Sequence, residues 1–142
     1  MIEKDSIEEQ IKLYSQLLPR IDKLVYPELP DLQKQYKLNK TQVKTVMIIG
    51  LYNGSVMKEL WEILNVTKGN LSILIDSLVN KKLVLCERQT DDRRKVRVYL
   101  AKEGETLYKE ILGKTGTHIQ ESKLKINKKE RDTLKKLIEN PV

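Results

Sequence analysis

An alternating segment and a shorter apolar segment, separated by a charged stretch, constrain the fold of this chain more than any other feature. Residues 96–100 alternate apolar and non-apolar side chains with the period of a half-buried strand, and residues 83–86 supply a matching strand. The stretch between them carries three neighbouring cations, Arg93, Arg94 and Lys95, which a packed core would not tolerate. The pattern therefore predicts a two-stranded hairpin with a basic tip that projects into solvent.

Most of the remaining chain has the periodicity of amphipathic helices. Only six glycines and four prolines occur among 142 residues, which favours a mostly helical protein. Apolar side chains spaced three and four residues apart indicate helices in seven places. These are residues 5–25, 31–36, 41–52, 55–64, 67–81, a long segment from Lys102 and a last one after Asn127.

Particular residues are expected to begin or interrupt these helices. Ser55 and Thr67 are natural N-caps for the helices that follow them. Asn127 with Glu130 approximates a capping box for the last helix. Pro19 lies within the apolar seam of the first helix, where we expect it to kink the helix or start a second segment.

The order of these elements predicts an architecture. Short helices with tight connections followed by a hairpin are typical of a winged helix-turn-helix. The apolar seams of the terminal helices have no partner within so small a domain, which suggests that they pack against a second copy. We expect a mostly α (α+β) fold with a winged helix-turn-helix lobe over residues 37–102, a two-stranded wing, and dimerisation helices over 1–36 and 103–142.

Positive charge is concentrated in one quarter of the chain. Residues 67–102 carry nine basic and four acidic groups, so +5 of the total +7 lies in this segment. A localised basic excess attracts polyanions, phosphate backbones above all. A solvated, lysine-rich surface is the alternative interpretation.

The sequence offers little support for an enzyme, a metal site or a cofactor. His118 and Cys86 are the single histidine and the single cysteine, and they lie 32 positions apart on different elements. Neither a paired metal-ligand spacing nor a phosphate-cradling glycine loop occurs. We expect His118 on the surface or at a dimer interface. Cys86 is expected to pack beside the hairpin, or alternatively to be a redox-sensing thiol whose thiolate Arg88 stabilises.

The N-terminus and the hydropathy pattern indicate where the protein acts. The acidic first residues are not followed by an apolar run, so we expect no secretory signal. No window approaches the ~18 apolar residues that suggest a membrane span. A lone cysteine cannot form an internal disulfide, and we therefore expect a cytoplasmic protein.

Five motifs in order carry a resemblance to a known family. They are LNKTQ at 38–42, MKEL at 57–60, DSLVNKKLV at 76–84, DRR at 92–94 and LAKEG at 100–104. With these motifs the chain resembles MarR-type (multiple antibiotic resistance) regulators over essentially its whole length. It departs from them where Lys82 and Cys86 replace a frequent Gly and a frequent Arg, and where Ile73 and Ser77 replace frequent basic residues.

The resemblance implies a homodimeric transcription regulator, most often a repressor, that binds a pseudo-palindromic DNA duplex. The helix over 67–81 would enter the major groove, where asparagine pairs with adenine, lysine with guanine, and a methyl-bearing side chain contacts the thymine methyl. Its candidate DNA contacts are Thr67, Lys68, Gly69, Asn70, Ser72, Ile73 and Ser77. Packing of Ile73 against a neighbouring loop remains open.

The wing would reach the adjacent minor groove, with separate roles for its side chains. Asp92 is expected to orient an arginine or cap the turn, because phosphates repel a carboxylate. Arg94 suits the negative potential of a narrow minor groove, while Arg93 and Lys95 would contact phosphates. A flexible, solvated loop is the alternative.

Small aromatic or lipophilic effectors regulate members of the family, in a crevice between the dimerisation helices and the DNA-binding lobe. Candidates to line it here are Tyr14, Tyr36, Trp61 and Tyr108, each of which also suits an ordinary core position. The alternative function is a winged-helix module that binds protein without specific DNA binding, against which the basic wing argues.

Overall fold

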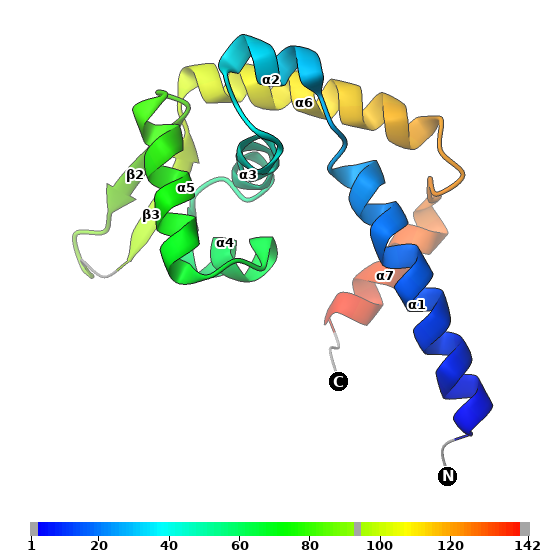
Figure 1. Ribbon diagram of the computed structural model, residues 1–142. Helices are drawn as coiled ribbons and strands as arrows, with labels where there is room; N and C mark the ends of the chain where they lie inside the picture. The colour runs from blue at the N-terminus through cyan, green and yellow to red at the C-terminus, as the bar shows by residue number, and fades with distance from the viewer. Residues whose placement is uncertain (1–2, 93–94, 140–142) are drawn as a thin grey trace. The chain divides into compact units, whose positions relative to one another are not determined.

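The structure is a computed structural model that describes residues 3–92 and 95–139 (Figure 1). It is mostly helical with a small antiparallel sheet, as expected, and matches the predicted winged-helix fold. The elements are α1 (Lys4–Val25), α2 (Pro30–Tyr36), α3 (Lys40–Leu51), β1 (Ser55–Val56), α4 (Met57–Leu64), α5 (Lys68–Asn80), β2 (Val84–Arg88), β3 (Val96–Leu100), α6 (Lys102–Gln120) and α7 (Lys128–Glu139).

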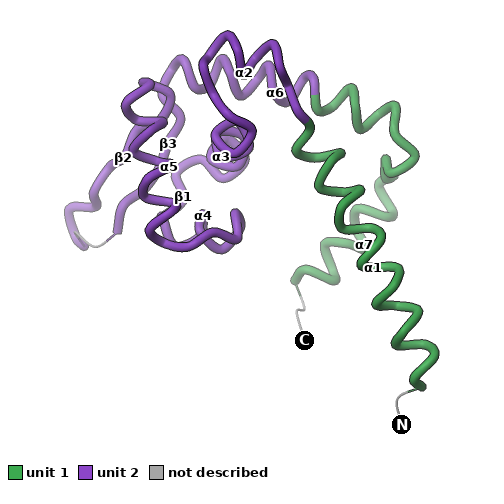
Figure 2. Tube along the Cα trace, viewed as in Figure 1, with its two compact units in different colours: residues 1–27, 115–142 green, residues 28–114 purple. Residues whose placement is uncertain are grey.

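The chain forms two compact units (Figure 2). Unit 1 comprises residues 1–27 and 115–142, and unit 2 comprises residues 28–114. Helix α6 contributes to both, because the division falls within it. The predicted assignment of DNA binding to 37–102 and of dimerisation to the flanking segments remains a prediction. No helix within the described ranges is long and apolar enough to span a membrane.

Unit 2 has a continuous hydrophobic core. Helix α3 is its centre, since six of its twelve residues are buried, from Val43 to Ile49. Leu60 of α4, Leu71 of α5 and Leu107 of α6 are completely buried as well. Helices α4 and α5 each bury one apolar face, as the sequence periodicity indicates, whereas residues 45–49 of α3 are all buried, so this helix is enclosed on every side and is not amphipathic as predicted.

The sheet has three strands in the order β1-β3-β2, one more than the two-stranded wing predicted from the sequence. Ser55 pairs with Val98 of β3 and is buried, so the expectation that Ser55 caps a helix was wrong. The N-cap of α4 is Val56, whose side chain makes no capping hydrogen bond. Two residues of strand are too few to show alternation, and only their pairing with a distant strand reveals them.

The other predicted helix ends can be compared directly. Thr67 caps α5 with its hydroxyl, which accepts a hydrogen bond from the backbone N–H of Asn70 at 3.2 Å, as predicted. Asn127 and Glu130 form the predicted capping box before α7. Pro19 lies inside α1, which continues to Val25, so the first helix is not divided in two.

Two backbone positions fix the connections around the sheet. Lys82, between α5 and β2, adopts a φ of 63°, a left-handed conformation that favours glycine. Gly104 lies in the first turn of α6 so close to the carbonyl oxygen of Leu83 that a Cβ would collide with it. That same carbonyl accepts a hydrogen bond from the backbone N–H of Ala101 at 2.9 Å. The Leu-x-x-x-Gly motif thus allows α6 to begin against the backbone that follows α5.

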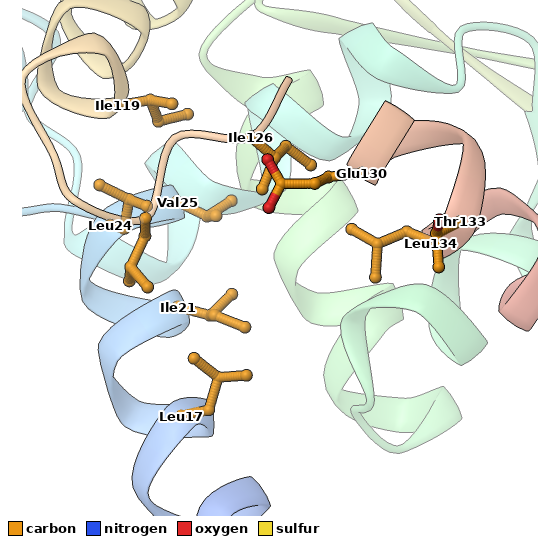
Figure 3. Close-up of a pocket in the computed structure, with 10 residues that line it drawn as sticks. Leu17, Ile21, Leu24, Val25, Ile119, Ile126, Glu130, Thr133 and Leu134 are labelled. Carbon is orange, nitrogen blue, oxygen red and sulfur yellow. The ribbon is translucent and has the colours of Figure 1, made fainter. Parts of the chain in front are cut away.

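Unit 1 has almost no core of its own. Leu24 is the only buried residue of α1, and α7 has none. An apolar groove of about 600 Å³ runs along this unit and is lined by Ile21, Ile119 and Leu134, among others (Figure 3). Glu130 supplies its one charged side chain.

Candidate nucleic-acid interface

Helix α5 presents a solvent-facing surface opposite its packed side. Leu71, Ile75 and Leu78 are buried, which confirms the main core positions predicted for this helix. Val79 was predicted to join them, but it is 37% exposed because it lies in the last turn, beyond the packed segment.

The exposed side of α5 contains most of the predicted DNA contacts. Thr67, Lys68, Gly69, Asn70, Ser72 and Ile73 are all exposed. Ile73 has 69% of its surface exposed, so it does not pack against a neighbouring loop of this chain. The arrangement offers an amide, an amine and a branched alkyl group to solvent from the first two turns of one helix.

Ser77 differs from the other predicted contacts. The helix wheel places it outward, yet it is half-buried and its hydroxyl has two partners. It donates to the carbonyl oxygen of Leu74 at 2.7 Å and accepts from Nε2 of Gln42 at 3.2 Å. Gln42 lies in the first turn of α3, and nothing in the local pattern of the sequence indicated this contact.

The start of α5 is held by an aromatic residue of α4. The Nζ atom of Lys68 lies 6.0 Å from the centroid of the Trp61 ring, within range of a cation–π interaction. Trp61 is half-buried and so provides a fixed platform for a flexible ammonium group. The contact keeps the charge of Lys68 near the N-terminal end of α5.

The described part of the wing closes with backbone hydrogen bonds. The backbone N–H of Gln89 donates to the carbonyl oxygen of Lys95 at 3.0 Å, and the N–H of Lys95 donates to that of Asp92 at 3.0 Å. Asp92 is half-buried and Lys95 exposed. Arg93 and Arg94, two of the four predicted wing contacts, lie outside the described residues.

The base of the wing is tied to the turn that precedes β1. Nη1 of Arg97 donates to the carbonyl oxygen of Gly54 at 2.8 Å, and the backbone N–H of Leu100 donates to Oδ1 of Asn53 at 2.9 Å. Gly54 itself has a φ of 87° and donates to Val98. Arg97 thus links the hairpin to Gly54 through its guanidinium, a role that its basic character alone did not predict.

The four aromatic candidates for an effector crevice belong to different units. Tyr14 is exposed in unit 1, whereas Tyr36, Trp61 and Tyr108 are half-buried in unit 2. Tyr108 lies against Gly50, where a Cβ would collide with its ring. Burial raises the pKa of Tyr36, and the nearby carboxylates of α6 raise it further.

The single cysteine and the single histidine both lie on the surface. Cys86 is exposed on β2, and its pKa is raised by partial desolvation and then by the carboxylate of Asp76. A raised pKa disfavours the thiolate, which argues against the alternative of a thiolate stabilised by Arg88. His118 is exposed in unit 1, and the described ranges hold no group of three residues able to bind a metal ion.

Comparison with known proteins agrees with this geometry. A family described as transcriptional regulator SarA/Rot matches residues 30–111. No curated protein sequence matches the chain significantly.

Three solved structures illustrate the similarity of fold. Wild-type MarR from E. coli is 22% identical, with a TM-score of 0.62 over 98% of this chain and 96% of that one. A MepR mutant from S. aureus, bound to an oligodeoxyribonucleotide, is 19% identical, with a TM-score of 0.59 over 89% and 93%. NadR in complex with 4-hydroxyphenylacetate is 19% identical, with a TM-score of 0.65 over 98% and 90%. At these identities the structures confirm the winged-helix fold of MarR-type proteins.

Proposed function

The chain belongs to the SarA/Rot family of transcriptional regulators, and from this premise we propose that it binds specific double-stranded DNA as a homodimer and represses transcription. The observation that carries the proposal is the exposed face of α5, which lies beside strand β2 of the wing. With the basic residues that the sequence gives the wing, unit 2 would combine groups that read base edges with groups that bind phosphate.

Helix α5 supplies the base contacts in this proposal. The carboxamide of Asn70 suits an adenine edge, and the ammonium of Lys68 suits guanine. Ile73 is an exposed branched alkyl group on an otherwise polar face, which suits the thymine methyl group. Three further residues would lie near the DNA backbone at the edge of the major groove: Thr67, Gly69 and Ser72.

The wing supplies the contacts that position the duplex. Arg94 would enter the minor groove, while Arg93 and Lys95 would bind phosphates. The carboxylate of Asp92 would orient an arginine or cap the turn, because phosphates repel it. Helix α5 carries fewer cations than the wing does. Contacts with the phosphate backbone of the DNA should therefore contribute much of the affinity for the duplex.

A salt series on duplex DNA tests the proposal. Duplexes would be selected by the protein from a random-sequence library, and their affinity compared with that of a random duplex of equal length between 50 and about 200 mM salt. We expect a steep, roughly log-linear loss of affinity, and a persistent preference for the selected duplex. Failure to bind at low salt, or a flat salt response, would refute the proposal and favour a winged-helix module that binds protein.

Dimer formation is proposed from the incomplete packing of unit 1. The exposed apolar residues of its helices are Ile7, Ile11, Leu13, Tyr14, Leu17, Leu18 and Ile21 on α1 and Leu134, Leu137 and Ile138 on α7. A second copy would cover this surface and the groove beside it, in keeping with the larger apolar patches that mark interaction sites. Two copies would present two α5 helices to half-sites about one helical turn apart.

An aromatic or lipophilic effector that relieves repression is a further part of the proposal. It is supported by the half-buried rings of Tyr36, Trp61 and Tyr108, although each also contributes to ordinary packing. Such a ligand would act by favouring one spacing of the two DNA-binding lobes. Trp61 is the only tryptophan, so quenching of its fluorescence during titration with 4-hydroxyphenylacetate tests for binding. As a regulator that acts on DNA, the protein would work in the cytoplasm.

A further inference from the structure

We propose that Gln42 is a positioning residue for the recognition helix, and that Ser77 holds α5 in place for reading DNA and does not itself read it. This inference rests on the proposed DNA-binding function and deepens it. The carrying observation is a chain of hydrogen bonds that joins the first turn of α3 to the exposed side of α5.

The carboxamide of Gln42 has a fixed orientation. Its Oε1 accepts the backbone N–H of Asn39 at 2.9 Å, while Oδ1 of Asn39 accepts the backbone N–H of Gln42 at 2.8 Å. This capping box points the oxygen of the carboxamide toward Asn39. The amino group is then left to donate to Ser77, which it does across 35 positions of sequence.

The hydroxyl of Ser77 is already used within the protein. A serine has one proton to donate, and that of Ser77 goes to the carbonyl oxygen of Leu74 at 2.7 Å. Its oxygen accepts from Gln42, and the side chain is half-buried. A base acceptor would have to displace the carbonyl oxygen of Leu74 to bind the proton, and a base donor could reach only the remaining lone pair of a half-buried side chain, so Ser77 serves better as an anchor.

Ser77 lies on the reading side of α5, which is the side that carries Asn70 and Ile73, the residues proposed to contact bases. Ser77 follows Ile73 by four residues and Asn70 by seven, so the three share one side of α5. Apolar packing at Leu71, Ile75 and Leu78 on the opposite side is non-directional and permits small rotations of the helix. The hydrogen bond between Gln42 and Ser77 is directional and lies on the reading side, so it limits such rotations. It thereby also limits how far Asn70 and Ile73 can move away from a base edge.

A double-mutant cycle with Ser77→Ala and Gln42→Met tests the proposal in the full-length protein. Gln42→Met keeps the length of the side chain but removes both of its hydrogen bonds. Gln33→Met is the matched control, because Oε1 of Gln33 accepts the backbone N–H of Leu29 at the start of α2. That control removes a similar N-terminal hydrogen bond without touching α5. Affinity is measured for a duplex selected by the wild-type protein and for a random duplex of equal length.

We expect each single variant to lose affinity for the selected duplex about 3- to 10-fold, the worth of one hydrogen bond. Affinity for the random duplex and the salt slope should not change, since no phosphate contact is removed. The double variant should be no weaker than the weaker single variant, and Gln33→Met should bind as wild type does.

Other outcomes overturn the proposal. If Ser77→Ala weakens selective binding and Gln42→Met does not, Ser77 reads DNA directly. If neither variant changes the preference, or their effects simply add, the contact does not position the helix. Failure of the wild-type protein to select any duplex would instead refute the proposed function, and is distinguished by that control.

Discussion

Helix α3 of unit 2 and helix α1 of unit 1 are both rich in apolar residues, but they use these residues differently. Six of the twelve residues of α3 are buried within its own unit, whereas α1 buries one of twenty-two. Helix α7, also in unit 1, buries none of its twelve. Unit 2 therefore contains most of the buried apolar residues, while unit 1 exposes an apolar surface of the kind that marks interaction sites.

This difference separates stability from assembly. Substitutions in the core of unit 2 should lower the free energy of unfolding irrespective of protein concentration. Substitutions on the exposed apolar side of unit 1 should change association, and their effect on stability should depend on concentration. Each of the predictions below tests one side of that contrast.

The largest effect is expected for Leu18→Asp on α1. Leu18 is 67% exposed in the single chain, so a carboxylate there costs little unless a partner covers it. Within a dimer it would place a charge in an apolar contact in both copies, and we expect dissociation to become more than about 100-fold easier. Sedimentation velocity over a concentration range measures this.

Leu85→Asp is the control for Leu18→Asp. Leu85 is 56% exposed on β2 of unit 2, so the same change is made at a similar exposure but outside the proposed interface. Its sedimentation should match that of the wild-type protein. Equal behaviour of the two variants would contradict the assignment of dimerisation to unit 1.

Two glycines of one helix provide the next test. Gly104, in the part of α6 that belongs to unit 2, has no room for a Cβ, whereas Gly116 in unit 1 has nothing within 4 Å of that position. Gly104→Ala should lower the free energy of unfolding by about 2–3 kcal/mol through overpacking against backbone. Gly116→Ala should raise it by about 0.5–1 kcal/mol through helix propensity. Urea denaturation followed by circular dichroism measures both free energies of unfolding. If both substitutions changed the free energy of unfolding in the same direction, the contrast between the two units would be refuted.

A smaller gain is expected from the backbone strain that unit 2 carries. Among the described residues, the non-glycine positions with positive φ are Lys37, Asn65 and Lys82, all in this unit. Lys82→Gly should raise the free energy of unfolding by about 1 kcal/mol, because glycine adopts φ near 63° without penalty. The neighbouring Lys81 has a φ of −85°, so Lys81→Gly should be neutral or destabilising. Thermal denaturation of Lys82→Gly and Lys81→Gly at the same protein concentration shows whether their stabilities differ in this way.

The smallest effect concerns Cys86, a natural probe of unit 2. Desolvation and the carboxylate of Asp76 raise its pKa, so its thiolate fraction is lowered in the folded state. Iodoacetamide should therefore modify the native protein at pH 8 more slowly than the urea-unfolded protein, and Asp76→Asn should speed the reaction about two-fold. A faster reaction in the native state would indicate a redox-sensing thiol after all.

The same shift links Cys86 to stability. A pKa that is higher in the folded than in the unfolded state favours folding while the thiol stays protonated. This contribution is fully present below the pKa of the unfolded thiol and is lost as the pH rises through that of the folded thiol. Cys86→Ser should remove this part of the alkaline decline in stability.

The sequence predicted well those features that depend on residues close together in the chain. The cap at Thr67 and the box at Asn127 and Glu130 each involve residues three positions apart, so their chemistry is visible locally. Alternation predicted the hairpin, and helical periodicity predicted the buried side of α5. The order of the elements predicted the winged helix-turn-helix, and the resemblance to MarR-type regulators added the expected function.

Features that depend on distant pairing were missed. The strand β1 exists because Ser55 meets Val98, and Ser77 loses its exposure because Gln42 reaches it from another helix. Such contacts depend on how helices pack in three dimensions. The spacing of residues along the sequence gives no information about that packing. The predicted DNA and effector contacts, Arg93 and Arg94 included, remain predictions that the experiments above address.

Helix α6 imposes a constraint on how the length of this protein can vary. It continues as one helix from Lys102 to Gln120, although its residues up to 114 belong to unit 2 and those from 115 to unit 1. One inserted residue in a helix rotates everything beyond it by about 100° and advances it by about 1.5 Å. Insertions and deletions among natural relatives should therefore be rare within α6.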